Sequence, residues 1–143
     1  MVDPAAKKPV LRVMAYSPTE YLEQGITEVS QLREILDRWP VTWIDVEGVG
    51  DAQVVKQLGD LLALHSLALE DAVHMHQRAK IEQYDNHLFI VARTVLMNHS
   101  IETEQVSLFV GAKFVLTFQE DRPGDPFEPV RVRIRKAASR IRG

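Results

Sequence analysis

The chain has 143 residues and a formal net charge of −3, and 45% of its residues are hydrophobic while 26% are charged. This length and balance are typical of one soluble globular domain. No cysteine occurs, which excludes disulfides, thiolate metal sites and cysteine nucleophiles. The longest apolar stretches, 88–97 and 107–118, are each interrupted by a cation and fall short of the roughly 20 residues that span a bilayer. No apolar segment of a signal peptide follows the N-terminal lysines, so we expect a soluble, cytosolic type of domain.

Hydrophobic periodicity divides the chain into alternating strands and helices. In the first half, the predicted elements are a strand over 10–16, a turn or helix start over 17–19, a helix over 28–39, a strand over 41–46 and helices over 52–62 and 66–74. In the second half, they are hairpins over 80–84 with 87–96 and over 105–110 with 113–118, a proline-rich loop over 122–129 and a final helix. This order predicts a single α/β domain over residues 1–143, with a sheet that is at least partly antiparallel.

The final helix is marked by apolar residues at helical spacing, which we expect to face the core: Val130, Ile134, Ala138 and Ile141. Residues 130–143 also carry six of the 17 Lys and Arg residues and no acid. We interpret these cations as one solvated helix face. A single-strand binder would interleave aromatic residues with the cations, and this segment has none, so no nucleic-acid partner is expected.

Two groups of acids have ordinary structural interpretations. Asp45, Glu47 and Asp51 flank a glycine-containing turn and are expected on the exposed face of a strand and at a helix cap. The acids of the proline-rich loop match no calcium-loop spacing: Glu120, Asp121, Asp125 and Glu128. The sequence also lacks the phosphate-loop, dinucleotide, serine-hydrolase and zinc-protease motifs, so we do not expect an enzyme.

The candidate site is the stretch LALEDAVHMHQRAK, residues 67–80. If a helix begins at Ser66 as its cap, Glu70 and Asp71 lie four and three residues before His74, so these three side chains could serve one ion. The side chains expected to anchor the other side of the helix are Leu64, Leu67, Ala68 and Ala72. The alternative interpretation is a solvated helix face without a ligand.

Ligand chemistry separates two kinds of metal site here. Zinc takes three or four N, S or O ligands, of which His74 and His76 together with the two acids could supply some. Magnesium keeps several waters and commonly takes only one or two carboxylates, which suits the Glu70–Asp71 pair. Because His76 lies only two residues after His74, the two imidazoles do not share one helix face.

Four segments, taken in order, resemble the cytoplasmic N-terminal domain of CorA-type magnesium and cobalt transporters. They are WIDVEGVGD, LHSLALEDAVHMHQRAKIEQYDNHLFIVARTVL, EQVSLFVGAKFVLTFQE and FEPVRVRIRKAASRIR, and the resemblance extends from about residue 11 to the end. It implies an α/β/α sandwich with a central mixed, largely antiparallel sheet. In the family a stalk helix and two transmembrane helices follow, so the resemblance implies a domain on the cytoplasmic side of the cell membrane.

The resemblance also implies a regulatory role and partners. In such transporters five subunits surround one pore, and cytosolic Mg²⁺ between neighbouring domains and stalk helices holds the pore closed. The acidic pair of that site corresponds to Glu70 and Asp71, with Co²⁺ as a second candidate ion. Gln77, Arg78 and Lys80 are expected to fix the turn from helix to strand. The alternatives are a zinc-transporting relative, in which His74 and His76 contribute, and a freestanding interaction module.

Overall fold

The computed structural model describes residues 10–48, 52–73, 77–97, 101–119 and 128–136. Within these residues the chain forms one seven-stranded sheet in the order β2-β1-β3-β7-β6-β5-β4. The strands are β1 (Val10–Tyr16), β2 (Tyr21–Ile26), β3 (Val41–Glu47), β4 (Lys80–Gln83), β5 (Leu88–Met97), β6 (Ile101–Val110) and β7 (Phe114–Gln119). Only the central β3–β7 pair is parallel, so the predicted mixed, largely antiparallel sheet is confirmed.

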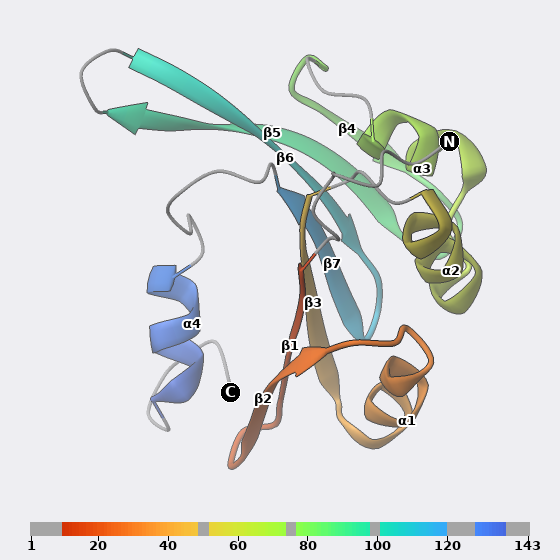
Figure 1. Ribbon diagram of the computed structural model, residues 1–143, viewed down its shortest axis with the longest axis vertical. Coiled ribbons are helices and arrows are strands. Elements are labelled where there is room, and N and C mark those ends of the chain that lie inside the picture. Colours follow the sequence, from red (N-terminus) through yellow and green to blue (C-terminus); the bar gives the residue numbers. More distant parts are fainter. Residues whose placement is uncertain (1–9, 49–51, 74–76, 98–100, 120–127, 137–143) are drawn as a thin grey trace.

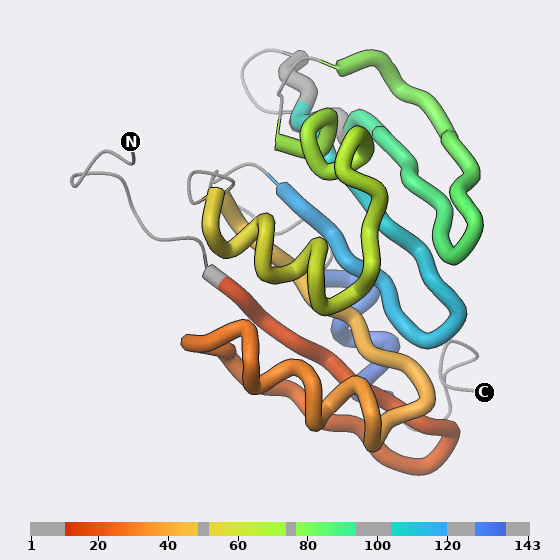
Figure 2. Tube along the Cα trace, turned by 90° about the vertical axis from the view of Figure 1, so that its right-hand side faces the viewer, coloured from red at the N-terminus to blue at the C-terminus, as the bar shows by residue number. Residues whose placement is uncertain are grey.

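Helices cover both faces of this sheet (Figure 1). On one face lie α1 (Gln31–Arg38), α2 (Ala52–Leu62) and α3 (Ser66–Val73), and on the other lies α4 (Glu128–Arg135). Figure 2 shows the first three helices in front of the strands and α4 behind them. The α/β/α sandwich expected from the sequence is therefore confirmed, with α1 starting three residues later than predicted.

The larger core lies between the sheet and the three helices on one face. Its fully buried side chains include Leu32 of α1, Leu58 of α2 and three aromatic or aliphatic residues from neighbouring strands, Phe89, Phe109 and Leu116. The Phe89 and Phe109 rings stack with their centroids 4.8 Å apart. This core is what holds α2 and α3 against the β4–β5 end of the sheet.

Strand β2 is absent from the sequence prediction, which placed a turn or helix start at 17–19. The turn exists: the amide of Ser17 donates to the carbonyl of Glu20 (2.9 Å), and the amide of Glu20 donates to the hydroxyl of Ser17 (3.0 Å). It returns the chain antiparallel to β1, with Tyr16 paired to Tyr21. Because β2 is an edge strand and Ile26 is its only buried residue, it lacks the apolar alternation that identifies a strand.

The interpretation of Asp45 as an exposed acid is wrong. Its side chain is completely buried and accepts hydrogen bonds from Thr117 Oγ1 (2.7 Å), Gln119 Nε2 (2.7 Å) and Arg131 Nη2 (2.6 Å). Thr117 is the register partner of Asp45 on β7, so the parallel pairing sets this cluster. Asp45 is thus a structural ion-pair partner of α4.

Two expectations for the start of the final helix also differ from the structure. Arg131, expected in solvent, is 1% exposed, and Val130, expected in the core, is 37% exposed. The solvated basic face and the apolar stripe through Val130 were therefore both wrong at the start of α4, although Ile134 is buried as predicted. The guanidinium of Arg131 also lies over the Trp43 ring, 4.5 Å from its centroid. Within the described part of α4 the buried side chains are the cation Arg131 and the apolar Ile134. Ala138 and Ile141 of the predicted stripe lie outside the described residues.

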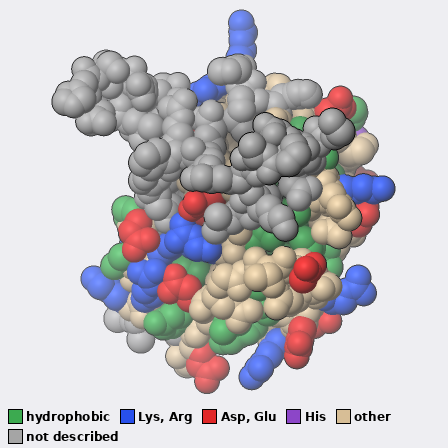
Figure 3. Space-filling view, viewed as in Figure 1, with side chains coloured by type: hydrophobic (Ala, Val, Ile, Leu, Met, Phe, Trp, Pro, Cys, Tyr) green, Lys and Arg blue, Asp and Glu red, His purple; other side chains and the backbone are tan. Residues whose placement is uncertain are grey.

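On the outer side of α4, Arg135 pairs with Glu23 of β2 (2.7 Å) and with Glu128 (3.1 Å). These side chains are about one-third to one-half exposed. Figure 3 shows acidic and basic side chains intermixed over the side of the molecule where α4 lies. The same helix therefore carries one buried ion pair and one exposed ion-pair cluster.

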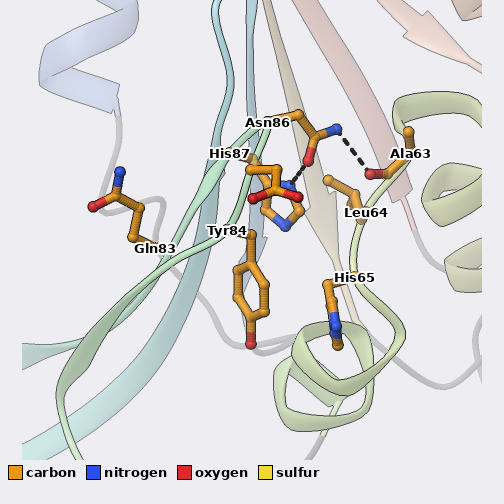
Figure 4. Close-up of a pocket in the computed structure, with 8 residues that line it drawn as sticks. Ala63, Leu64, His65, Gln83, Tyr84, Asn86 and His87 are labelled. Atoms are coloured by element: carbon orange, nitrogen blue, oxygen red, sulfur yellow. Dashed lines mark hydrogen bonds between the residues drawn. The ribbon is translucent and has the colours of Figure 1, made fainter.

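A second cluster joins the turn between α2 and α3 to the β4–β5 hairpin (Figure 4). The ring of Tyr84 stacks between His65 and His87, with centroid distances of 4.6 Å and 5.0 Å. These rings and the residues beside them line a cavity of about 370 Å³. The stack positions the start of α3, because His65 immediately precedes that helix.

Hydrogen bonds fix the protonation pattern of the buried member of this stack, His87. Asn86 Nδ2 donates to the carbonyl of Ala63 (2.9 Å), whose backbone is left-handed (φ 54°), and this bond directs Asn86 Oδ1 towards His87 Nδ1 (2.6 Å). Nδ1 is therefore the donor, and the buried Nε2 has no hydrogen-bond partner among the described residues. Burial first, and then the electrostatic effect of the neighbouring His65, lower the pKa of His87 from its ordinary 6.5.

The buried ion pair of α4 can be tested by stability. Arg131→Met should lower the free energy of unfolding by about 3–5 kcal/mol, because the Asp45 carboxylate stays buried without its cation. Arg135→Met is the matched control on the same helix and should cost no more than about 1 kcal/mol, since its pairs are exposed to solvent. Urea unfolding at pH 7 measures both, and equal losses would show that burial of the pair is unimportant.

The buried imidazole predicts an acid-dependent loss of stability. The pKa of His87 is lower in the folded chain than in the unfolded chain, where it is about 6.5. As the pH falls to about 6.5 and below, the unfolded chain therefore binds a proton that the folded chain does not. The free energy of unfolding, which is fully retained above this pH, decreases as the pH falls further. His87→Gln should flatten this part of the curve. His65→Gln should keep most of it, because burial is the larger cause of the shift. Urea unfolding from pH 8 to pH 5 tests this, and an unchanged slope in His87→Gln would contradict it.

Candidate functional site

Helix α3, which carries the predicted acids, packs closely on α2. Gly59 of α2 permits this approach, because a Cβ at that position would collide with the Leu69 side chain of α3. Ala68 and Ala72 are buried as predicted, but Leu67 is 61% exposed, so its predicted role as an anchor is wrong and Leu69 packs on the core instead. The helix therefore turns its next residue, Glu70, outward.

The start of α3 differs by one residue from the prediction. Ser66 is the first helical residue rather than the cap, and the preceding His65 accepts a hydrogen bond at Nδ1 from the amide of Leu67 (3.2 Å). Small polar residues are the usual caps, so the sequence favoured Ser66. The imidazole of His65 thus serves both the helix start and the stack with Tyr84.

The two predicted carboxylates lie on adjacent positions of α3 with different surroundings. Glu70 is exposed, whereas the Asp71 side chain is 36% exposed and accepts a hydrogen bond at Oδ2 from Lys80 Nζ (2.8 Å). The same ammonium lies 3.0 Å from Oε1 of Glu82 on β4. A third carboxylate, which the sequence analysis did not single out, therefore shares a cation with the predicted pair.

The ammonium of Lys80 is held in its charged form by these contacts. The hydrogen bonds to Asp71 and then to Glu82 raise the pKa of Lys80 above its ordinary 10.5. Its Nζ also lies 5.7 Å from the centroid of the Phe89 ring, at the edge of the core. In this structure Asp71 thus has a positively charged neighbour from its own chain.

The predicted turn residues differ in how they act. The amide of Gln77 donates to Oε1 of the buried Gln105 (2.7 Å), and its carbonyl accepts from Arg93 Nη2 (2.9 Å), so its backbone is fixed from β5 and β6. Arg78 is exposed. Lys80 links α3 to β4 through Asp71. Gln105 stands at the start of the predicted strand 105–110 and follows the polar residues 102–104, so no sequence signal indicated its inward role.

The alternative ligands His74 and His76 lie outside the described residues. Within the described part of the chain, no group of three or more His, Asp or Glu side chains is placed to hold a metal ion. The carboxylates of Glu70 and Asp71 fit a hydrated, hard cation such as Mg²⁺, which needs only one or two protein oxygens. The described residues therefore do not by themselves form a complete coordination shell for such an ion.

Comparison with known proteins agrees with the resemblance carried by the sequence motifs. The chain is 40% identical over 128 residues to the cobalt/magnesium transport protein CorA of Thermotoga maritima, covering 87% of this chain. It spans only 36% of the length of that protein. No helix in the described ranges is both long enough and apolar enough to cross a membrane.

Solved structures share the fold at low sequence identity. The cytoplasmic domain of ZntB from Vibrio parahaemolyticus aligns with a TM-score of 0.67 and 10% identity, over 91% of this chain and 51% of that one. The soluble domain of CorA from Methanocaldococcus jannaschii aligns with a TM-score of 0.59 and 16% identity, over 85% of this chain and 43% of that one. At these identities the likeness concerns the fold alone.

Family membership rests on the sequence match. The family model described as CorA-like Mg²⁺ transporter protein matches residues 40–140, a range that includes β3, the acids of α3 and the buried Arg131 of α4. The chain therefore belongs to the CorA-like Mg²⁺ transporter family.

Proposed function

We propose that this chain is the cytosolic regulatory domain of a divalent-cation transporter and that it senses intracellular Mg²⁺ through Glu70 and Asp71. The observation that carries the proposal is the placement of these two carboxylates on the outward side of α3 in a chain of this family. Mg²⁺ retains much of its hydration and accepts such an incomplete protein shell. Co²⁺ is the second ion that this oxygen site would take.

The exposed apolar residue beside the acids supports a contact with another subunit. Leu67 lies three residues before Glu70, so both share one side of α3, and its side chain is 61% exposed. A partner that covered this side chain would remove its apolar surface from water, which would favour the contact. In the proposed assembly the partner is a neighbouring subunit, five around one pore, and its own acids complete the shell.

Electrostatics supply the regulatory step in this assembly. Carboxylates of neighbouring subunits repel one another without a cation, and a divalent ion between them turns repulsion into a bridge. The closed arrangement is then stabilised in proportion to ion occupancy, by about 2.7 kcal/mol for one site filled at a hundred times its dissociation constant. Falling cytosolic Mg²⁺ removes the bridge and lets the pore open.

The incomplete shell predicts weak binding by the chain alone. Titration calorimetry with Mg²⁺ should detect no tight, stoichiometric binding, because two carboxylates must compete with the ion's hydration. Tight binding to the monomer would contradict the shared site. The same titration with Zn²⁺ tests the zinc alternative: tight binding that His74→Ala removes would favour a zinc-transporting relative.

Regulation is tested in the transporter assembled with this domain. Asp71→Asn removes a charge with little change of shape and should raise the internal Mg²⁺ concentration that half-closes the pore by roughly fivefold or more, while conduction persists. Asp60→Asn, an exposed acid on α2, is the matched control and should leave the curve unchanged. Ion flux against internal Mg²⁺ measures this. Unchanged inhibition in Asp71→Asn and in the Glu70/Asp71 double variant would remove α3 from the mechanism.

A further inference from the structure

We propose that Lys80 is a built-in competitor of the divalent cation: its ammonium occupies Asp71 in the metal-free domain, must be displaced by the incoming ion, and so sets the concentration at which the domain responds. The proposal rests on the function proposed above and names the residue that tunes its threshold. It also assigns Lys80 a role beyond the turn between α3 and β4.

The geometry places the ammonium where a cation would be bound. Lys80 Nζ lies between Asp71 Oδ2 (2.8 Å) and Glu82 Oε1 (3.0 Å), so two carboxylates from different elements converge on one positive charge. Lys80 and Glu82 are two residues apart on β4, so their side chains lie on the same face of that strand. The Lys80 ammonium contacts α3 by its hydrogen bond to Asp71. The ammonium thus acts as a tethered cation in a site built from carboxylate oxygens.

The two cations compete because Oδ2 of Asp71 cannot bind the metal ion and accept the hydrogen bond from Lys80 without bringing two positive charges close together. The N–H of Lys80 is directed at Oδ2, and a metal bound to that oxygen would lie within a few ångströms of a like charge. A lysine ammonium keeps its proton near neutral pH, so Lys80 does not leave Asp71 by becoming neutral. It yields by rotating away from Asp71, while Glu82 and the Phe89 ring remain as contacts.

The exposure of the pair determines the size of the effect. The side chains of Lys80, Asp71 and Glu82 are 32%, 36% and 40% exposed, so water screens their attraction. An ion pair of this kind changes an equilibrium constant by a factor of up to roughly five. Lys80 therefore shifts the threshold for the metal and does not block the site.

The release of Lys80 also connects the metal to the sheet. In the metal-free domain the Asp71–Lys80 bond links α3 to the first residue of β4. When the metal takes Asp71, this bond is lost, and the aromatic stack of His65 with Tyr84 remains between the same two regions. Metal binding would therefore loosen the attachment of α3 to β4, while the His65–Tyr84 stack and the hydrogen bond from Asn86 to the carbonyl of Ala63 still join the preceding turn to the hairpin.

Mn²⁺ provides a probe for weak binding to the chain itself. Amide signals of α3 broaden when Mn²⁺ binds nearby, and the concentration that half-broadens them measures relative affinity. In Lys80→Gln this concentration should fall roughly three- to fivefold, because the competing charge is gone. Lys80→Arg keeps the charge and should stay within about twofold of the wild type. Lys113→Gln, the same charge change in the exposed β6–β7 turn, should also match the wild type.

The outcomes separate the two proposals. If Asp71→Asn abolishes the broadening but Lys80→Gln leaves its midpoint unchanged or raises it, the metal site stands and the role of Lys80 is overturned. If Asp71→Asn leaves the broadening unchanged, or no variant shows any, the proposed site fails and the inference fails with it.

A second measurement does not depend on any variant that might unfold. Diamagnetic Mg²⁺ added to the wild type should move the Lys80 Cε and Hε signals towards those of a free lysine, in step with the Asp71 carboxyl signal. Movement of the Asp71 signal without movement of the Lys80 signals would overturn displacement.

Discussion

The placement of α4 depends on one buried charge, the Asp45 carboxylate on the central strand β3. Three donors converge on it, from Thr117 and Gln119 on β7 and from Arg131 on α4. Charges are tolerated in such a place only when they are paired and hydrogen-bonded, so the strand pairing and the helix position must both be correct before Asp45 is satisfied. The ion pair thus favours one arrangement of helix and sheet over its alternatives.

The α3–β4 end of the sheet uses the same chemistry in a different setting. There the Asp71–Lys80 pair is about one-third exposed and close to a second acid, Glu82. An exposed pair can exchange partners at low cost, whereas a buried pair cannot. The domain therefore combines a buried ion pair at α4 with a partly exposed ion pair at α3, and Asp71, one of the proposed metal-sensing acids, belongs to the exposed pair.

The sequence predicted those parts of the fold in which burial follows hydrophobic periodicity. The helix over Ala52–Leu62 and the two hairpins are confirmed because their apolar residues repeat at helical or alternating spacing. Strand β2 was missed because an edge strand with one buried residue carries no such pattern. Leu67 was misplaced because the close approach at Gly59 turns α3 so that Leu69 packs inward instead.

The charged residues show why site chemistry is harder to predict than fold. Asp45 and Arg131 are 86 positions apart, and only the parallel β3–β7 pairing brings α4 over Asp45. Likewise, the sequence analysis named Asp71 as a candidate ligand and Lys80 as a turn residue but did not predict their ion pair, because a contact between a helix and the following strand has no fixed spacing. Residue spacing identifies side chains that share one helix or strand. Whether a carboxylate is paired or available to a ligand depends on the cation that a different element places beside it. For Asp71 that cation is the Lys80 ammonium of the same chain, and any metal ion must compete with it.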